Sequence, residues 1–283
     1  MENTQRSIES WVEFFSAKEI PVLRQTVRSM EQARSDIDHI NGRQAAAIVM
    51  HDPLMTMRVL AYISTHHDRR LQKEITTIEQ AVMMQGVEPF FRCFEQLAVV
   101  EEQLKPEPQA LLGLLYVIRR SQRAAKYAGD WATWRHDLGF EEIILAALLH
   151  DLAEILIWCF APQQALQVLR MQKADASLRS ADVQQTVLGF RFSELQLALC
   201  TVWQLPKIHI EMLDPAQAEQ PRVKNVQLAA DLARHSANGW DNAALPDDYS
   251  AIEALLHIDR DMLLARLGLK SPDAAEAAVR VEE

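Results

Sequence analysis

Two adjacent side chains, His150 and Asp151, have the residue types and the spacing to do chemistry. An imidazole beside a carboxylate is a common metal-binding pair, and a bound divalent cation can activate water for hydrolysis. The pair lies in an apolar run, residues 143–160, where burying an ionised carboxylate without a partner is costly. Asp151 must therefore face a cleft, a cation or hydrogen-bond donors.

The segment that carries the pair, residues 141–160, is predicted to be one helix buried on most of its faces, because it is apolar almost all round. His150, Asp151 and Glu154 interrupt it near its middle. Fewer than about 18 consecutive apolar residues remain on either side of them. The segment is therefore predicted to be a core helix and not a membrane span.

The composition predicts an all-α fold. The 283 residues include only 8 Gly and 11 Pro, and no stretch shows the apolar and polar alternation of a half-buried strand.

The net charge of −10, with basic residues scattered along the chain, disfavours nucleic-acid binding. Cys93, Cys159 and Cys200 are far apart and indicate buried thiols in a reducing compartment. Because the N-terminus lacks the apolar core of a signal peptide, a cytoplasmic location is expected.

Capping and proline signals predict the helix boundaries. Thr76 and Glu79 have the spacing of a capping box, and Asp52, which follows His51 and precedes Pro53, is expected to cap a helix. Residues 105–108, Lys-Pro-Glu-Pro, form the best linker because two prolines so close together cannot continue a helix. The predicted helices cover residues 21–33, 41–50, 54–66, 89–103, 109–128, 141–160, 162–172, 181–204, 222–237 and 259–267, with 131–136 as a loop.

Five short motifs follow one another along the chain. They are Ile20-Pro21-Val22-Leu23, Asp52-Pro53-Leu54-Met55-Thr56, the segment from Ile75 to Gly86, Leu148-Leu149-His150-Asp151-Leu152-Ala153-Glu154, and Trp203-Gln204-Leu205-Pro206. In this order they resemble the HDOD family, a helical relative of the HD-superfamily metal-dependent phosphohydrolases of bacterial signalling. The resemblance covers about residues 15–235. The chain departs from the family in having Ala153-Glu154 where Gly-Lys is frequent, and Ile63-Ser64 where Asn-Ser is frequent.

The resemblance implies an all-α, two-lobed helical HDOD-type body. Its N-terminal helical subdomain would span residues 1–105. Residues 106–283 would form an HD-like helical core followed by C-terminal helices and a tail.

The resemblance also implies a ligand set, and this chain lacks part of it. An HD-type site needs a histidine from the helix before the pair, but none occurs between His67 and His136. The residues best aligned with the missing ligand are Arg119 and Arg120. A fixed positive charge about 5 Å from a divalent cation would be repulsive by roughly 5 kcal/mol or more at an effective dielectric constant near 20. We therefore expect no metal and no other cofactor, and we expect Arg120 to pair with Asp151 instead.

Asp231 matches the distal aspartate of the family site. The predicted vestigial pocket comprises Arg120, His150, Asp151 and Asp231. Structural roles stay open for some of these residues. His150 and Glu154, four residues apart, can hydrogen-bond on one helix face, and Asp231 can be an ordinary polar residue of an amphipathic helix.

The resemblance implies a non-catalytic bacterial signal-transduction output or scaffold module with a degenerate metal site. Its implied partner is a separate signalling protein, either a response regulator or a cyclic-dinucleotide protein, with self-association as a further option. Neither nucleic acid nor a membrane is expected as a partner. Two alternatives stay open. One is a metal-dependent phosphohydrolase or cyclic-dinucleotide phosphodiesterase, and the other is a nucleotide sensor that contacts a phosphate through Arg119 or Arg120 without hydrolysis.

Overall fold

The chain is all-helical, as its composition predicts. The computed structural model describes residues 6–66, 74–175 and 177–269. In these ranges the regular elements are α-helices and two short 3-10 helices, and a single isolated β-bridge joins Val22 to Val99. The helices before the predicted linker are α1 (Ile8–Ser16), α2 (Arg24–Ser35), α3 (Gly42–Met50), α4 (Pro53–His66), α5 (Ile78–Gln85), α6 (Val87–Cys93) and α7 (Val100–Gln103). The later ones are α8 (Pro108–Trp134), α9 (Phe140–Leu149), α10 (Leu152–Phe160), α11 (Pro162–Ala174), α12 (Ser180–Leu188), α13 (Phe192–Val202), α14 (Lys207–Leu213), α15 (Pro221–His235), α16 (Leu245–Leu256) and α17 (Arg260–Arg266).

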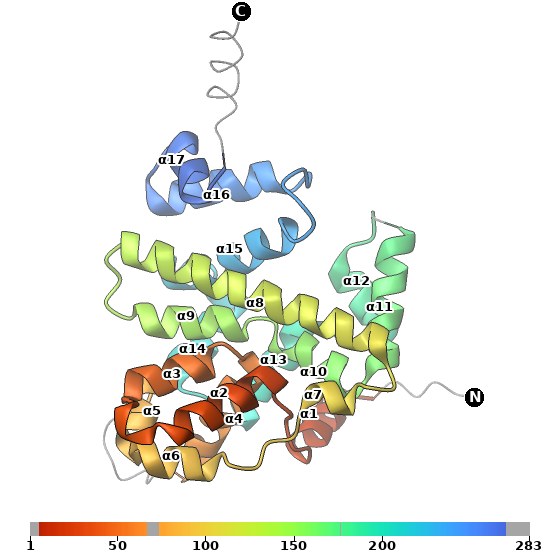
Figure 1. Ribbon diagram of the computed structural model, residues 1–283. Coiled ribbons are helices and arrows are strands. Elements are labelled where there is room, and N and C mark those ends of the chain that lie inside the picture. Colours follow the sequence, from red (N-terminus) through yellow and green to blue (C-terminus); the bar gives the residue numbers. More distant parts are fainter. Residues whose placement is uncertain (1–5, 67–73, 176, 270–283) are drawn as a thin grey trace, which may run out of the picture.

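The long helix α8 crosses the molecule and organises the packing around it (Figure 1). Helices α9 and α15 lie along it, the N-terminal helices α2 to α6 gather on the far side of α9, and α16 and α17 lie beyond α15. Two glycines allow the close approach of neighbouring helices to α8. A Cβ atom at Gly113 would lie 2.5 Å from Trp158 of α10, and one at Gly129 would lie 2.8 Å from Ile144 of α9. Any larger side chain at these positions would force the helices apart.

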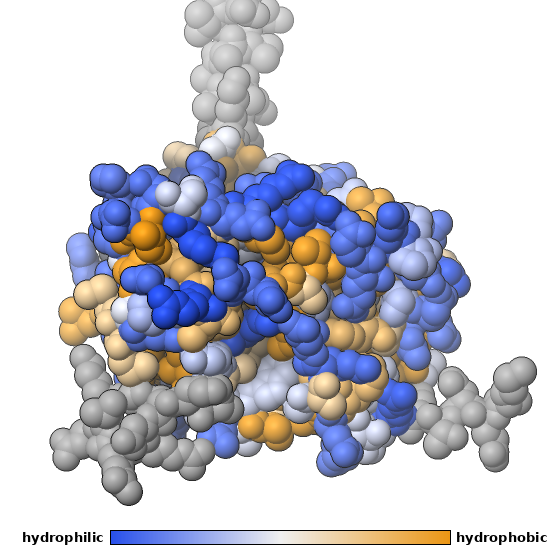
Figure 2. Space-filling model, turned by 60° about the horizontal axis from the view of Figure 1, so that its bottom comes forward, coloured by the Kyte–Doolittle hydropathy of each residue, from blue (hydrophilic) through white to orange (hydrophobic). Residues whose placement is uncertain are grey.

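Two large apolar clusters among the described residues hold these layers together. The larger contains buried residues from both sides of the linker, between Trp11 and Leu213. The smaller joins the C-terminal part of α8 to α9, α15, α16 and α17. The face shown in Figure 2 is largely hydrophilic, with smaller hydrophobic areas between. The predicted division into residues 1–105 and 106–283 stays a prediction.

The apolar run that carries the His-Asp pair forms part of the core. Over Phe140–Phe160 it has the length and mean hydropathy, 2.0, of a membrane span, but 72% of that window is buried inside the protein. It also consists of two helices, α9 and α10, and not the single helix predicted for residues 141–160. Burial in the core accounts for its apolar composition.

The predicted capping role of Asp52 is confirmed. Its Oδ1 accepts a hydrogen bond from the Leu54 amide at 2.9 Å, in the first turn of α4. Its Oδ2 accepts from the Leu23 amide and from the Thr26 hydroxyl, both at 2.8 Å, and the side chain is fully buried. Burial raises the pKa of Asp52, although these hydrogen bonds oppose the rise. One carboxylate thus ties two of the five sequence motifs together.

Several predicted boundaries were wrong for identifiable reasons. The cap of α5 is Thr77, whose hydroxyl accepts from the Gln80 amide, one residue after the predicted Thr76. Residues 89–103 hold two helices, because residues 98–100 leave the helix to bond with Val22. Residues 181–204 also hold two, because Gly189 adopts a left-handed conformation with φ of 87° and ends α12. Helix α8 continues through Trp131, which is buried, so the predicted loop begins only after Trp134.

The cysteines differ from one another in exposure. Cys159 and Cys200 are buried as expected, but Cys93 is exposed and accepts a hydrogen bond from the Gln85 side chain. Burial raises the pKa of Cys200 to about 12 and that of Cys159 further. The two buried thiols are therefore protonated and unreactive at neutral pH.

A buried histidine should make stability depend on pH. The side chain of His209 is fully buried, and its Nε2 donates to the Thr76 carbonyl at 2.7 Å. Its Nδ1 has no hydrogen-bond partner among the described residues. Burial lowers the pKa of His209, and the hydrogen bond to Thr76 together with the nearby carboxylates of Glu142 and Glu74 offsets only part of that effect.

Because the unfolded chain then binds a proton more readily than the folded one, we expect stability to fall as the pH drops below about 6.5. This one group can contribute up to about 1.4 kcal/mol per pH unit. The free energy of unfolding, measured between pH 7.5 and 5.5, should fall less steeply in His209→Gln than in the wild type. His51→Gln, which changes an exposed histidine, is the matched control. The same slope for His209→Gln and the wild type would refute the assignment.

Candidate functional site

The His-Asp pair lies at a break between two helices, and a glutamine from a third helix fills the break. In a continuous helix the Ala153 amide would donate to the Leu149 carbonyl. Here the side chain of Gln196, from α13, stands between them. Its Nε2 donates to Leu149 O at 2.9 Å, and its Oε1 accepts from Ala153 N at 2.8 Å. Because Gln196 satisfies both buried backbone groups, His150 and Asp151 can leave the helix at this point.

Arg120, near the middle of α8, reaches two carboxylates at this break. Its Nε donates to Asp151 Oδ2 at 2.8 Å, and its Nη2 donates to Glu154 Oε2 at 2.6 Å. The three side chains are 15%, 16% and 22% exposed, respectively. The predicted Arg120–Asp151 pair is therefore present, with Glu154 as a second partner. We call Arg120, Asp151 and Glu154 the arginine clamp.

The two remaining carboxylate oxygens also receive donors. His150 Nδ1 lies 3.0 Å from Asp151 Oδ1, and it must carry the hydrogen because a carboxylate only accepts. Trp158 Nε1 donates to Glu154 Oε1 at 3.4 Å. The suggested hydrogen bond between His150 and Glu154 is absent from the described contacts, because each side chain bonds elsewhere. All four oxygens of the clamp thus have a donor.

The electrostatics favour the charged forms of both Asp151 and Arg120. Burial opposes the charge on Asp151, but Arg120 and His150 outweigh it and hold the pKa of Asp151 below its usual range. Burial likewise opposes the charge on Arg120, and the two carboxylates raise its pKa above the usual value. Two carboxylates and one guanidinium give the clamp a net charge of −1.

The residues of the clamp do not fit a divalent cation. A metal would have to approach the carboxylate oxygens to about 2.0–2.6 Å, and Arg120 nitrogens already lie 2.8 Å from Asp151 Oδ2 and 2.6 Å from Glu154 Oε2. The guanidinium stays charged at neutral pH, because the two carboxylates raise the pKa of Arg120 above its usual value. Among the described residues, no group of three or more His, Cys, Asp and Glu side chains has an arrangement that could hold a metal ion.

The other two predicted site residues lie outside the clamp. Asp231, on α15, forms an ion pair with Arg234, three residues further along the same helix, and its charge raises the pKa of Asp248. No described contact joins Asp231 to His150 or Asp151. Arg119 is exposed on α8. The structure therefore brings together Arg120, His150 and Asp151 but not Asp231 or Arg119.

Sequence reasoning missed Glu154 and Gln196 as members of the site. The sequence does carry a signal for Glu154, because an acid stands where the family frequently has lysine, and an acid can pair with a nearby arginine. No comparable signal exists for Gln196, because a polar residue on a partly apolar helix is ordinary. Its role depends on how α13 packs against the break.

Comparisons with known proteins agree with the helical fold and the motifs. The HDOD domain model matches residues 20–218, more than half of the chain. The chain is similar to the MmoQ response regulator from Methylococcus capsulatus, with 18% identity and a TM-score of 0.66 over 89% of this chain and 98% of that one. It is also similar to a virulence factor from Campylobacter jejuni, with 20% identity and a TM-score of 0.62 over 96% and 94% of the two chains. No curated protein matches the chain.

At such low sequence identity, the similarity to these two structures shows the fold alone. The family match covers all five sequence motifs, from Ile20 to Pro206, and agrees with the range inferred from them. Two of the motifs also meet in the structure, because Asp52 accepts a hydrogen bond from the Leu23 amide. The chain belongs to the HDOD family.

Proposed function

We propose that this chain is a non-catalytic signal-transduction module in which an ion pair has replaced the metal of an HD-type site. The observation that carries the proposal is the position of Arg120, within 2.8 Å of Asp151 and 2.6 Å of Glu154. A guanidinium there supplies the positive charge that a buried carboxylate requires. It also excludes the cation that would activate water. The pocket would then serve the packing of α8 against α10.

The signalling role is supported by the family and by a similar protein. The MmoQ protein, which shares the fold, is described as a response regulator. We infer that this chain acts in the bacterial cytoplasm through a separate signalling protein, either a response regulator or a cyclic-dinucleotide protein. The nucleotide-sensor alternative has less support, because a phosphate at Arg120 would meet two carboxylates that already neutralise it.

A hydrolysis assay tests the non-catalytic part of the proposal. The wild type and Asp151→Ala would be incubated with Mn²⁺, Fe²⁺ or Mg²⁺ and with bis(p-nitrophenyl) phosphate or cyclic dinucleotides. We expect the same background rate from both proteins, because Arg120 blocks the oxygens that a catalytic metal would need. Metal-dependent turnover by the wild type that Asp151→Ala abolishes would show a working phosphohydrolase.

A further inference from the structure

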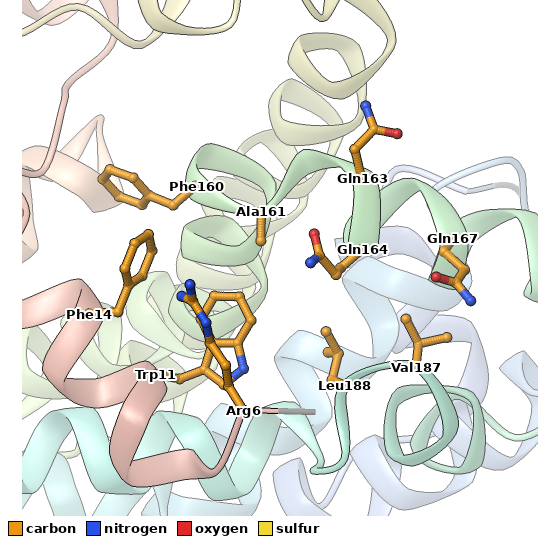
Figure 3. Close-up of a pocket in the computed structure, with 10 residues that line it drawn as sticks. All are labelled: Arg6, Trp11, Phe14, Phe160, Ala161, Gln163, Gln164, Gln167, Val187 and Leu188. Atoms are coloured by element: carbon orange, nitrogen blue, oxygen red, sulfur yellow. The ribbon is translucent and has the colours of Figure 1, made fainter. Parts of the chain in front are cut away.

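A cavity of about 340 Å³ lies between α1, the junction of α10 and α11, and α12, away from the arginine clamp. Its volume is at the lower end of the range for small-ligand pockets, about 300–1,000 Å³. Figure 3 shows Arg6 beside Trp11 on one side of the cavity and Gln164 with Leu188 across from them. The walls thus combine aromatic and aliphatic side chains with a few polar groups, as ligand pockets commonly do.

Among the described residues that line this cavity, Arg6 is the one that carries a charge. Its guanidinium carbon lies 5.2 Å from the centre of the Trp11 ring and 4.9 Å from that of Phe14. Among the described residues, no carboxylate forms an ion pair with it. The ring faces hold the cation in place, and its N–H donors remain available to an anion.

Further hydrogen-bonding capacity faces the arginine. The side chains of Gln164 and Gln167, on α11, line the cavity, and no described residue hydrogen-bonds their amides. Gln163, by contrast, donates to Glu107 at 2.9 Å. An amide can donate to or accept from a polar substituent of a bound molecule. The cavity therefore offers a cation, aromatic and aliphatic walls, and two adaptable amides.

We propose that this cavity is a binding site for a small aromatic anion, with its ring against the apolar walls and its carboxylate or phosphate on Arg6. An anion is favoured over a cation because Arg6 would repel a cation. A ring is favoured over a fully polar ion because Trp11, Phe14 and Leu188 form much of the wall. Phe160, which also lines the cavity, ends α10, the helix that begins at the break beside Asp151.

Two fluorescent dyes with the same N-phenylnaphthylamine skeleton test the proposal on the full chain. 8-Anilinonaphthalene-1-sulfonate carries a sulfonate, and N-phenyl-1-naphthylamine is its neutral counterpart. We expect the wild type to bind one sulfonate dye, and Arg6→Gln to weaken that binding about tenfold or more while leaving the neutral dye unaffected. Lys18→Gln is the matched control, because Lys18 also lies over the Phe14 ring, 5.2 Å from its centre, but does not line the cavity. It should change neither affinity.

A blocking variant locates the dye. Gln164 is exposed on α11, so Gln164→Trp should fill the cavity without disturbing the core and should abolish binding of both dyes. Circular dichroism and the unfolding midpoint of each variant would establish that it folds. Equal affinity of the wild type for the two dyes, no effect of Arg6→Gln, or undiminished binding in Gln164→Trp would each overturn the proposal.

Competition then identifies the anionic group. Displacement of the bound sulfonate dye by 1-naphthoate would assign a carboxylate ligand, and displacement by 1-naphthyl phosphate would assign a phosphate ligand. Either result supports the site. Displacement by neither compound would contradict it.

Discussion

Arg120→Ala is expected to destabilise the protein by about 3–5 kcal/mol, because it leaves two partly buried carboxylates without their cation. Asp151 and Glu154 are only 16% and 22% exposed, so water can replace the guanidinium only in part. The free energy of unfolding from urea denaturation measures the effect. Arg119→Ala, which removes an exposed arginine from the same turn of α8, is the matched control and should change stability by less than about 0.5 kcal/mol.

The pH dependence of the stability lost in Arg120→Ala distinguishes the loss of the ion pair from the loss of side-chain packing. In the wild type the pKa of Asp151 is lowered, so its contribution is present above the ordinary aspartate value, near 3.8, and is lost as the pH falls below it. In Arg120→Ala the buried carboxylates can take up protons and relieve the orphaned charge. The difference between the two proteins should therefore shrink as the solution is made acidic. A loss below roughly 1 kcal/mol at neutral pH, or a loss independent of pH, would contradict the ion-pair assignment.

Gln196→Leu is expected to cost about 2–4 kcal/mol, because it removes the partners of two buried backbone groups. Leucine fills a similar volume, but it can neither donate to the Leu149 carbonyl nor accept from the Ala153 amide. Those two groups must then stay unpaired or bond to each other. The second outcome would make α9 and α10 one helix and would move Asp151 away from Arg120.

Urea denaturation of Gln196→Leu gives the size of the effect, and Ser193→Ala is the control, because Ser193 is exposed on the same helix. A double variant with Arg120→Ala tests the link between the break and the clamp. If the break positions Asp151, the two substitutions should be less destabilising together than the sum of their separate effects. A cost of Gln196→Leu below about 1 kcal/mol would show that the helix can close without penalty.

The sequence predicts much of the fold because its local signals are strong. Asp52 caps α4 as its place before Pro53 predicts, and a helix forms over Gly42–Met50, inside the predicted range 41–50. The apolar pattern of residues 143–160 correctly predicts a position in the core. Its interruption was not predicted, because the break depends on Gln196, which is 43 residues from Ala153 in sequence. Tertiary hydrogen bonds of this kind produce no periodic pattern in the sequence.

The candidate site was predictable only in part, for a similar reason. Arg120 and Asp151 could be paired because a buried carboxylate needs a cation and no histidine was available. Glu154 joins them because the helix that starts at Leu152 turns its side chain back towards α8. Asp231 matched a family position, but its neighbour Arg234 on α15 provides a closer partner.

Elemental analysis of the protein, purified without chelators, tests most directly whether the arginine clamp has replaced a metal. Iron, manganese and zinc would be measured by mass spectrometry in the wild type and in Asp151→Ala. The clamp predicts that neither protein holds a stoichiometric metal ion, because Arg120 already neutralises the carboxylates. One metal ion per wild-type chain that is lost in Asp151→Ala would contradict the account.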